Sequence, residues 1–260
     1  MGRLSRILLF LLMLGPPVTG GAAPQRVVSL DLCTDWLVAD ALPPARVAGL
    51  SPLHRRYPVD WVGNAWPTHD GALETLIALQ PDLVITGEYN ALQLRERLRA
   101  LGVRVAVLPL PQTLAGVAQY QQRFRQLLAL PDVDPPAAGV DARPPEPLPP
   151  QRLLLLGANG LGTGTNTLEH AILRAAGWHN YLTSPGVTRL DLEAIAARPP
   201  DAVLWSAPAS PALANRFAEH PVLARLIDAR SWLAVDHWRW QCPGPWTWDL
   251  IAQLRTWRNP

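Results

Sequence analysis

Cysteine and histidine are the residues of this chain whose chemistry could bind a metal or form a cross-link. The 260 residues include two cysteines, Cys33 and Cys242, and six histidines. Three roles are open for the cysteines: a disulfide with each other, thiolate ligation of a soft or borderline metal assisted by His69 or His237, or inert burial. The sequence does not choose between these roles, and the metal that such a site would take is unknown.

Covalent and hydrolytic catalysis finds little support in the chain. All 23 basic residues are arginine, which leaves no lysine for Schiff-base or P-loop chemistry. Neither Gly-x-Ser-x-Gly nor His-Glu-x-x-His occurs. The glycine-rich stretch 157–164 misses the dinucleotide-binding spacing because Thr165 stands where the third glycine is needed. We therefore predict that the protein is not an enzyme, and that this stretch is a flexible loop beside a ligand.

The first 22 residues have the anatomy of a secretory signal peptide. Arg3 and Arg6 precede an apolar run over 7–14, and small residues follow at 20–23. The apolar run is too short to span a bilayer. We expect cleavage after Ala22, which would release the mature chain into the periplasm without a stable membrane anchor, in an oxidising compartment where a disulfide can persist.

Charge and composition exclude further classes. The formal net charge is +2, and no basic run is longer than Arg55-Arg56, so the electrostatic footprint of a nucleic-acid-binding protein is missing. With 48% hydrophobic and 17% charged residues, the chain can bury a core. A globular exported protein without a nucleic-acid partner is the class that remains.

Short apolar runs alternate with helical patterns, which is typical of an α/β fold with mostly parallel sheets. We expect strands over 26–30, 46–49, 83–86, 104–108, 152–156, 202–205 and 232–235. Helices are expected over 34–42, 72–79, 91–101, 113–130, 166–176, 190–197, 221–227 and 247–257.

An internal repeat divides the chain into two similar lobes. Leu73-Glu74 followed by Pro81-Asp82 recurs 119 residues later as Leu192-Glu193 followed by Pro200-Asp201. Between the copies, residues 131–150 contain eight prolines, a composition that forbids a continuous helix. We predict an N-terminal lobe over 23–130, a proline-rich linker over 131–150 and a C-terminal lobe over 151–260.

Ligands of parallel α/β sheets bind at the carboxyl ends of the strands. Aromatic residues dominate the loops expected there, and aromatic rings supply contact surface for a large planar ligand. The predicted ligand-binding residues are Cys33, Tyr57, Trp66, His69, Tyr89, Asn159, Trp238, Arg239 and Trp240.

Four segments carry a resemblance to a known family: RVVSLDLCTD at 26–35, GALE to PDLVI across 71–85, AAGWHN at 175–180 and WQCPGP at 240–245. Together they resemble the periplasmic substrate-binding proteins of ABC importers that handle ferric siderophores, haem and cobalamin. The resemblance covers nearly the whole mature chain. It implies two α/β lobes, a ligand cleft between them and a long bridging helix. Here that helix is either the one expected over 113–130 or it is replaced by the proline-rich spacer.

The resemblance also implies a role for two acidic residues. Glu74 and Glu193 occupy equivalent places in the repeat, each in the first turn of a helix, where the helix dipole favours a carboxylate. In the resembling proteins, glutamates at these places meet arginines of the importer's membrane subunits. The implied function is capture of a metal chelate or corrinoid by a monomer without a prosthetic group. The alternative is a periplasmic metal-ion binding protein or chaperone that uses Cys33, Cys242 and nearby histidines.

Overall fold

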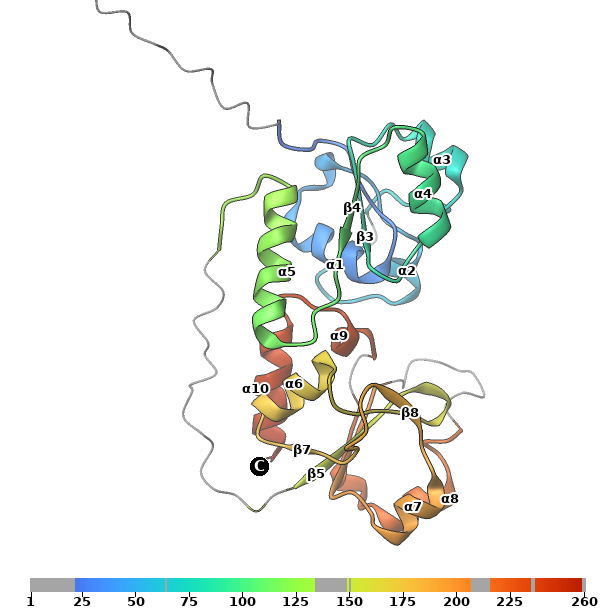
Figure 1. Cartoon of the computed structure of the whole chain (residues 1–260), viewed down its shortest axis with the longest axis vertical. Coiled ribbons are helices and arrows are strands. Elements are labelled where there is room, and N and C mark those ends of the chain that lie inside the picture. Colours follow the sequence, from blue (N-terminus) through green and yellow to red (C-terminus); the bar gives the residue numbers. More distant parts are fainter. Residues whose placement is uncertain are drawn as a thin grey trace, which may run out of the picture.

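The computed structural model describes residues 22–63, 65–133, 149, 151–206, 216–234 and 237–258, without the side chains of 237 and 238. In the first lobe, four parallel strands form a sheet in the order β2-β1-β3-β4 (Figure 1). The strands are β1 (Val27–Ser29), β2 (Val47–Gly49), β3 (Leu83–Gly87) and β4 (Val105–Leu108).

Helices cover both faces of this sheet because its strands alternate between two apolar clusters. Val27 and Ile85 pack with α1 (Leu32–Ala41) and α5 (Leu114–Leu127) on one face. Val28 and Val84 pack with α3 (Leu73–Ala78) and α4 (Leu92–Ala100) on the other. A side chain on every second residue points to the same face of a strand, so apolar residues in succession fill both layers.

The second lobe repeats this plan. Its parallel strands β7 (His179–Asn180), β5 (Arg152–Leu156), β9 (Ala202–Trp205) and β10 (Trp232–Ala234) correspond to β2, β1, β3 and β4. Its helices are α6 (Leu168–Ala175), α7 (Leu192–Ala197), α8 (Pro221–Leu226) and α10 (Thr247–Arg258). An addition is the antiparallel pair β6 (Leu161–Thr163) and β8 (Val187–Arg189), which continues the sheet beyond β5. The predicted α/β class with mostly parallel sheets is confirmed.

The sequence repeat corresponds to the same set of Arg–Asp hydrogen bonds in both lobes. The backbone N–H of Arg26 donates to Asp82, and that of Arg152 donates to Asp201. Each arginine side chain also donates to a carbonyl oxygen just before the Pro-Asp turn, that of Leu79 in one lobe and of Pro199 in the other. The Asp of each turn thus binds the start of the neighbouring strand, which explains why Pro-Asp precedes a strand in both copies.

Each of the expected strands and helices has a counterpart in the structure. Residues 53–56 and 237–241 form short helices that were not expected, α2 (Leu53–Arg56) and α9 (His237–Gln241). Strands β6, β7 and β8 were also not expected. The signal-peptide prediction, apart from Ala22, and most of the proline-rich stretch lie outside the described residues. Across the described part of the chain, no helix is both long and apolar enough to cross a membrane.

Two segments join the lobes. Helix α5 runs alongside both (Figure 1): Val117 packs into the core of the second lobe, while Tyr120 and Phe124 pack into that of the first. The helix expected over 113–130 therefore contacts both lobes. The chain also returns to the first lobe near its end, because Cys242 and Trp246 lie in the first core although α10 belongs to the second.

Candidate ligand-binding cleft

A disulfide joins the two lobes. Cys33, in the first turn of α1, is bonded to Cys242, which directly follows α9, and their Cα atoms are 4.9 Å apart. Of the three roles left open by the sequence, the structure has the disulfide. A bonded sulfur has no thiolate to offer, so the metal-ligating role of these cysteines is ruled out in this state.

The first lobe contributes one half of a candidate site. A hollow of about 200 Å³ opens at the carboxyl ends of β1, β3 and β4. Asp31 organises its floor, because the carboxylate accepts hydrogen bonds from the backbone N–H groups of Thr34 (3.1 Å) and Gly87 (2.7 Å). One carboxylate thus caps α1 and fixes the end of β3. The hollow is lined by Asp31, Cys33, Gly87, Glu88, Tyr89, Asn90, Leu108, Leu110, Tyr120, Gln241 and Pro243.

The second lobe contributes the other half. A hollow of about 230 Å³ lies at the carboxyl ends of β5 and β9, with β6 and β8 as one wall. Its lining is Leu155, Gly157, Ala158, Asn159, Leu161, Thr163, Glu169, Val187, Leu204, Ser206, Trp240 and Gln241.

Gln241, the last residue of α9, lines both hollows, so the two hollows meet at the end of this helix. Each hollow alone is smaller than the roughly 300–1,000 Å³ of most small-molecule sites. A ligand of that size would therefore contact both lobes. We call the two hollows together the cleft.

Two of the predicted ligand-binding residues lie open in the cleft. Tyr89 follows β3 and is 71% exposed, so its ring and hydroxyl are accessible. Asn159 projects from the turn after β5, where it adopts a left-handed conformation (φ 59°) that asparagine tolerates better than most residues. Cys33 also lines the cleft, but as half of the disulfide.

Three of the predicted residues, Tyr57, Trp66 and His69, line neither hollow. Trp66 is 9% exposed in the first core, and the partly buried Tyr57 packs against that core. His69 is 4% exposed, and both of its ring nitrogens are bonded. The backbone N–H of Gly71 donates to Nδ1 (3.0 Å), so Nε2 carries the proton and donates to the carbonyl oxygen of Ser29 (2.7 Å). His69 is a structural cross-link and has no lone pair left for a metal.

The predictions around α9 have mixed outcomes. Trp240 is 1% exposed and packs in the second core, so it supports the wall of the cleft without offering a free ring face. The Arg239 guanidinium lies over the ring of Trp61, 5.1 Å from its centroid, and Arg239 is not among the lining of either hollow. The side chains of His237 and Trp238 lie outside the described residues.

The structure does not support the alternative of a bare metal-ion site, because most of the side chains proposed as ligands are engaged elsewhere. No group of three His, Cys, Asp or Glu side chains that could hold a metal ion occurs among the described residues. Cys33 and Cys242 are bonded to each other and His69 is bonded to the backbone, so three of the four side chains proposed for that site are occupied.

The glycine-rich stretch is packed rather than flexible, which corrects a second expectation. A Cβ atom on Gly164 would lie 1.9 Å from the carbonyl oxygen of Ser184, and Gly160 adopts a positive φ of 67°. Glycine is needed at both positions because a side chain would collide or be strained there. The missing side chain lets the chain at Gly164 pass close to Ser184, and at Gly160 it leaves room for the ring of Phe217.

Burial changes the acid–base behaviour of two cleft residues. It raises the pKa of the Glu169 carboxyl, an effect that hydrogen bonds from its own N–H and from Thr167 partly oppose. The pKa of Tyr120 is raised as well, by burial first and then by the charge of Asp31. Tyr120 therefore stays a neutral phenol, and Tyr89 is the tyrosine in the cleft that solvent and ligand can reach.

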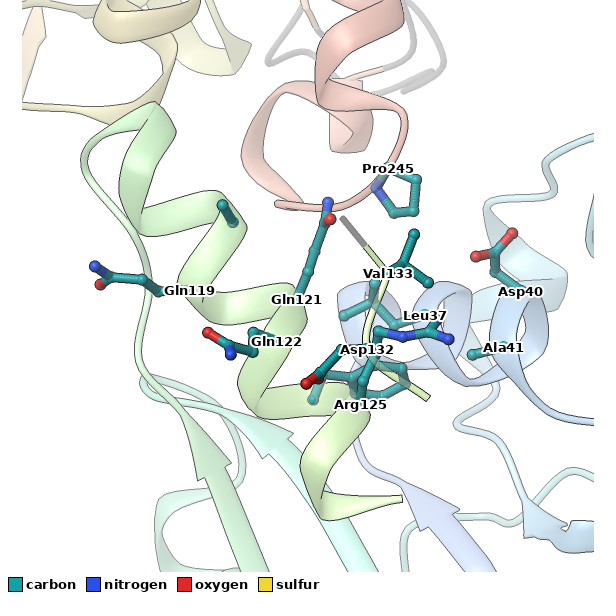
Figure 2. Close-up of a pocket in the computed structure, with 12 residues that line it drawn as sticks. Leu37, Asp40, Ala41, Gln119, Gln121, Gln122, Arg125, Asp132, Val133 and Pro245 are labelled. Carbon is teal, nitrogen blue, oxygen red and sulfur yellow. The ribbon is translucent and has the colours of Figure 1, made fainter. Parts of the chain in front are cut away.

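A larger cavity of about 400 Å³ lies away from the cleft, between α1 and α5 (Figure 2). Gln121 points towards Pro245 at its upper end, and Asp132 and Val133 close another side. This cavity opens beside the last described residues before 134, where the chain runs on. Neither sheet presents the carboxyl ends of its strands to it, so we do not assign the ligand to this cavity.

Several cleft residues were missed by reasoning from the sequence. Tyr120, Glu169 and Gln241 lie on helices, whereas the rule applied there selects loops after strands, and Asp31, which directly follows the strand expected over 26–30, was not chosen. Gln241 has one usable signal, since it directly precedes a cysteine that was already expected in a cleft loop.

No protein-family model matches the chain, and no curated protein matches it. Several solved protein structures do match the chain. A periplasmic haem-binding protein from Pseudomonas aeruginosa is 25% identical, with a TM-score of 0.70 over 90% of this chain and 92% of its own. A possible iron-binding periplasmic solute-binding protein from Staphylococcus epidermidis is 17% identical, with a TM-score of 0.69 over 91% and 99% of the two chains. This chain has the fold of the periplasmic solute-binding proteins.

A third structure agrees with this assignment: the haem-binding protein HutB of Vibrio cholerae is 18% identical, with a TM-score of 0.66 over 92% of this chain and 100% of its own. The resemblance carried by the four sequence segments is thus confirmed by structural neighbours that cover about nine-tenths of the chain. In the solute-binding-protein fold the lobes are the constant part, and the side chains in the cleft are what differ from one protein to another.

Proposed function

We propose that this protein is exported to the periplasm, captures a metal chelate of the haem, siderophore or corrinoid kind between its lobes, and delivers it to an ABC importer. The observation that carries the proposal is the pair of hollows at the carboxyl ends of two parallel sheets, which share Gln241 as a lining residue. The haem- and iron-binding neighbours support the ligand class. The chelate is cargo, held by contacts and released unchanged, so no catalysis is required.

Tyr89 is the side chain best placed to touch the chelate. Its exposed ring can pack against a planar ligand, and a tyrosine oxygen is a known ligand of haem iron. Asn159 lines the hollow of the second lobe and can accept or donate a hydrogen bond.

Titration of intrinsic fluorescence tests the capture step. Purified mature protein should show saturable quenching at a 1:1 ratio with at least one haem, ferric siderophore or corrinoid probe. Tyr89→Ala and Asn159→Ala should each weaken that binding about tenfold or more. The matched control is Leu101→Ala, which removes another exposed side chain at the end of α4, outside the cleft. If no probe quenches in a saturable manner, the proposal fails.

We propose further that Glu74 and Glu193 dock the loaded protein on the importer. Both carboxylates are exposed in the first turn of their helices, and α3 and α7 lie towards the two ends of the molecule, on the side away from α5 (Figure 1). Ion pairs among the described residues engage Glu96 and Asp201 but neither of these two glutamates. Two separated, unpaired negative charges, one on each lobe, suit recognition by arginines on a two-subunit partner.

A double variant tests the docking step. Glu74→Ala with Glu193→Ala should bind the chelate as the wild type does and abolish uptake in cells that depend on this protein. The control pair Glu96→Ala and Glu219→Ala removes one exposed carboxylate from each lobe and should leave uptake intact. Loss of chelate binding in the purified Glu74/Glu193 variant would refute the docking role.

A further inference from the structure

The titratable side chains that line the cleft are negative or neutral. Among the described lining residues, Asp31, Glu88 and Glu169 carry carboxyl groups, and no arginine is present. The three carboxyls come from both lobes, so a ligand that fills the cleft meets them on two sides.

Arginines near the cleft in sequence do not neutralise these carboxyls. Within the described chain, ion pairs join arginine side chains only to Glu96 and Asp201. Arg95 donates from Nη1 to the carbonyl oxygen of Glu88 (2.7 Å), not to its carboxylate. Arg239 is held over the Trp61 ring. The Glu88 carboxylate accepts one backbone hydrogen bond, from Leu110 (3.1 Å), and retains free acceptor capacity.

The remaining polar groups of the cleft are uncharged amides and hydroxyls. Asn90, Asn159 and Gln241 offer amide oxygens as acceptors, and Ser206 and Thr163 offer hydroxyls. The rest of the surface is apolar: Leu108, Leu110, Leu155, Leu161, Val187 and Leu204. Such a lining can pack a large apolar body and accept hydrogen bonds at its edge.

We propose that the chelate carried by this protein has no net negative charge and presents hydrogen-bond donors, such as amide or ammonium N–H groups, to the cleft. The inference rests on the proposed function and narrows its ligand class. A chelate with several carboxylate or catecholate charges would face carboxyls that form no ion pair with an arginine of the described chain, in a partly desolvated site where like charges repel strongly. An uncharged or cationic chelate gains from the same groups.

Competition among four probes tests the inference: cobinamide, a cationic ferric trihydroxamate, haemin with its two carboxylates, and an anionic ferric triscatecholate. We expect cobinamide or the trihydroxamate to bind at least tenfold more tightly than either anionic probe. Affinity for the cationic probe should fall as salt is raised, because salt screens the attraction.

Variants of the same side-chain shape test whether the carboxyls cause the preference for cationic over anionic probes. Glu88→Gln with Glu169→Gln replaces two carboxyls by amides of the same shape, keeps an acceptor at each position, and should reduce the preference for cationic over anionic probes at least threefold. Glu96→Gln, on α4 and outside the cleft lining, is the matched control and should leave the preference unchanged.

The outcomes separate this inference from the proposed function. Tighter binding of haemin or of the triscatecholate would overturn the charge inference and leave chelate capture standing. Binding by none of the four probes would overturn both. A preference that persists fully in the Glu88/Glu169 variant would show that these carboxyls do not cause it, which also overturns the inference.

Discussion

The two lobes have the same strand order and the same Arg–Asp hydrogen bonds, yet they are completed differently. Of the ten buried polar or charged residues among those described, eight lie in the first lobe, from Ser29 to Thr86. The second lobe has instead an extra antiparallel pair, β6 and β8, which lines its side of the cleft with Leu161, Thr163 and Val187. Equivalent topology thus supports a buried polar layer in the first lobe and an added strand pair beside the cleft in the second.

The lobes also differ in where their cores come from. The second core is built largely from residues after 150, with Leu114 and Val117 of α5 added. The first core includes Cys242 and Trp246 from near the end of the chain. Trp246 lies on Trp61 in a stacked pair (ring centroids 5.3 Å apart) and meets Trp36 edge-on (5.8 Å). The first lobe therefore cannot complete its core without the last part of the chain.

Replacing one buried tryptophan in each lobe gives the largest expected effect. Trp246→Ala and Trp178→Ala should each lose roughly 3–5 kcal/mol of the free energy of unfolding, because both rings are buried and each Nε1 donates to a backbone carbonyl. Hydrogen exchange should distinguish them. Trp246→Ala should speed exchange in β1 and β3 of the first lobe, and Trp178→Ala in β5 and β9 of the second. Faster exchange confined to the second lobe in Trp246→Ala would contradict the assignment of this residue to the first core.

Removing the disulfide has the next largest expected effect. Cys33→Ser with Cys242→Ser opens a cross-link between residues 209 positions apart, and about 2–4 kcal/mol of the free energy of unfolding should be lost. Urea denaturation measures it. Reductant should bring the wild type to the same midpoint and leave the double variant unchanged. A wild type indifferent to reductant would mean that this bond contributes nothing to holding the end of the chain on the first lobe.

The lobes themselves could be predicted from sequence because their signals are local. The alternation of apolar runs located the parallel strands, and the Leu-Glu to Pro-Asp repeat reflects a turn in which an aspartate binds the neighbouring strand. The differences between the lobes could not be predicted in this way. β6 and β8 are three residues each, and β6 contains a glycine whose requirement arises from packing against residues 182 and 190.

Cleft residues were harder to predict because residue type does not reveal burial. Tyr89 and Trp66 both follow predicted strands as aromatic residues, but one is 71% exposed and the other belongs to the core. His69 has the chemistry of a metal ligand, and its bond to the carbonyl oxygen of Ser29, 40 residues away, becomes visible only in the fold.

The polar layer of the first lobe predicts a dependence of stability on pH, in which a buried carboxyl and two histidines act in opposite directions. Asp35 is buried and accepts hydrogen bonds from the backbone N–H (2.9 Å) and hydroxyl (2.5 Å) of Ser51. Burial raises its pKa from 3.8 to about 7, against the opposing effect of hydrogen bonds from Ser29 and Ser51. The folded state therefore holds this proton more tightly than the unfolded state. The stabilisation is complete below pH 4 and is lost as the pH rises to 7, by up to about 1.4 kcal/mol per pH unit.

The histidines of the same layer act in the opposite direction. Burial lowers the pKa values of His54 and His69, so their contribution is present above pH 6.5 and is lost as the pH falls. In the wild type the two trends partly cancel. Asp35→Asn removes the carboxyl alone, so its free energy of unfolding should fall more steeply than that of the wild type between pH 6.5 and 5. Asp60→Asn, an exposed carboxyl of the same lobe, should follow the wild-type profile. If the Asp35→Asn profile also superimposes on the wild type, the Asp35 carboxyl titrates alike in both states, and the polar layer of the first lobe adds no pH dependence beyond its histidines.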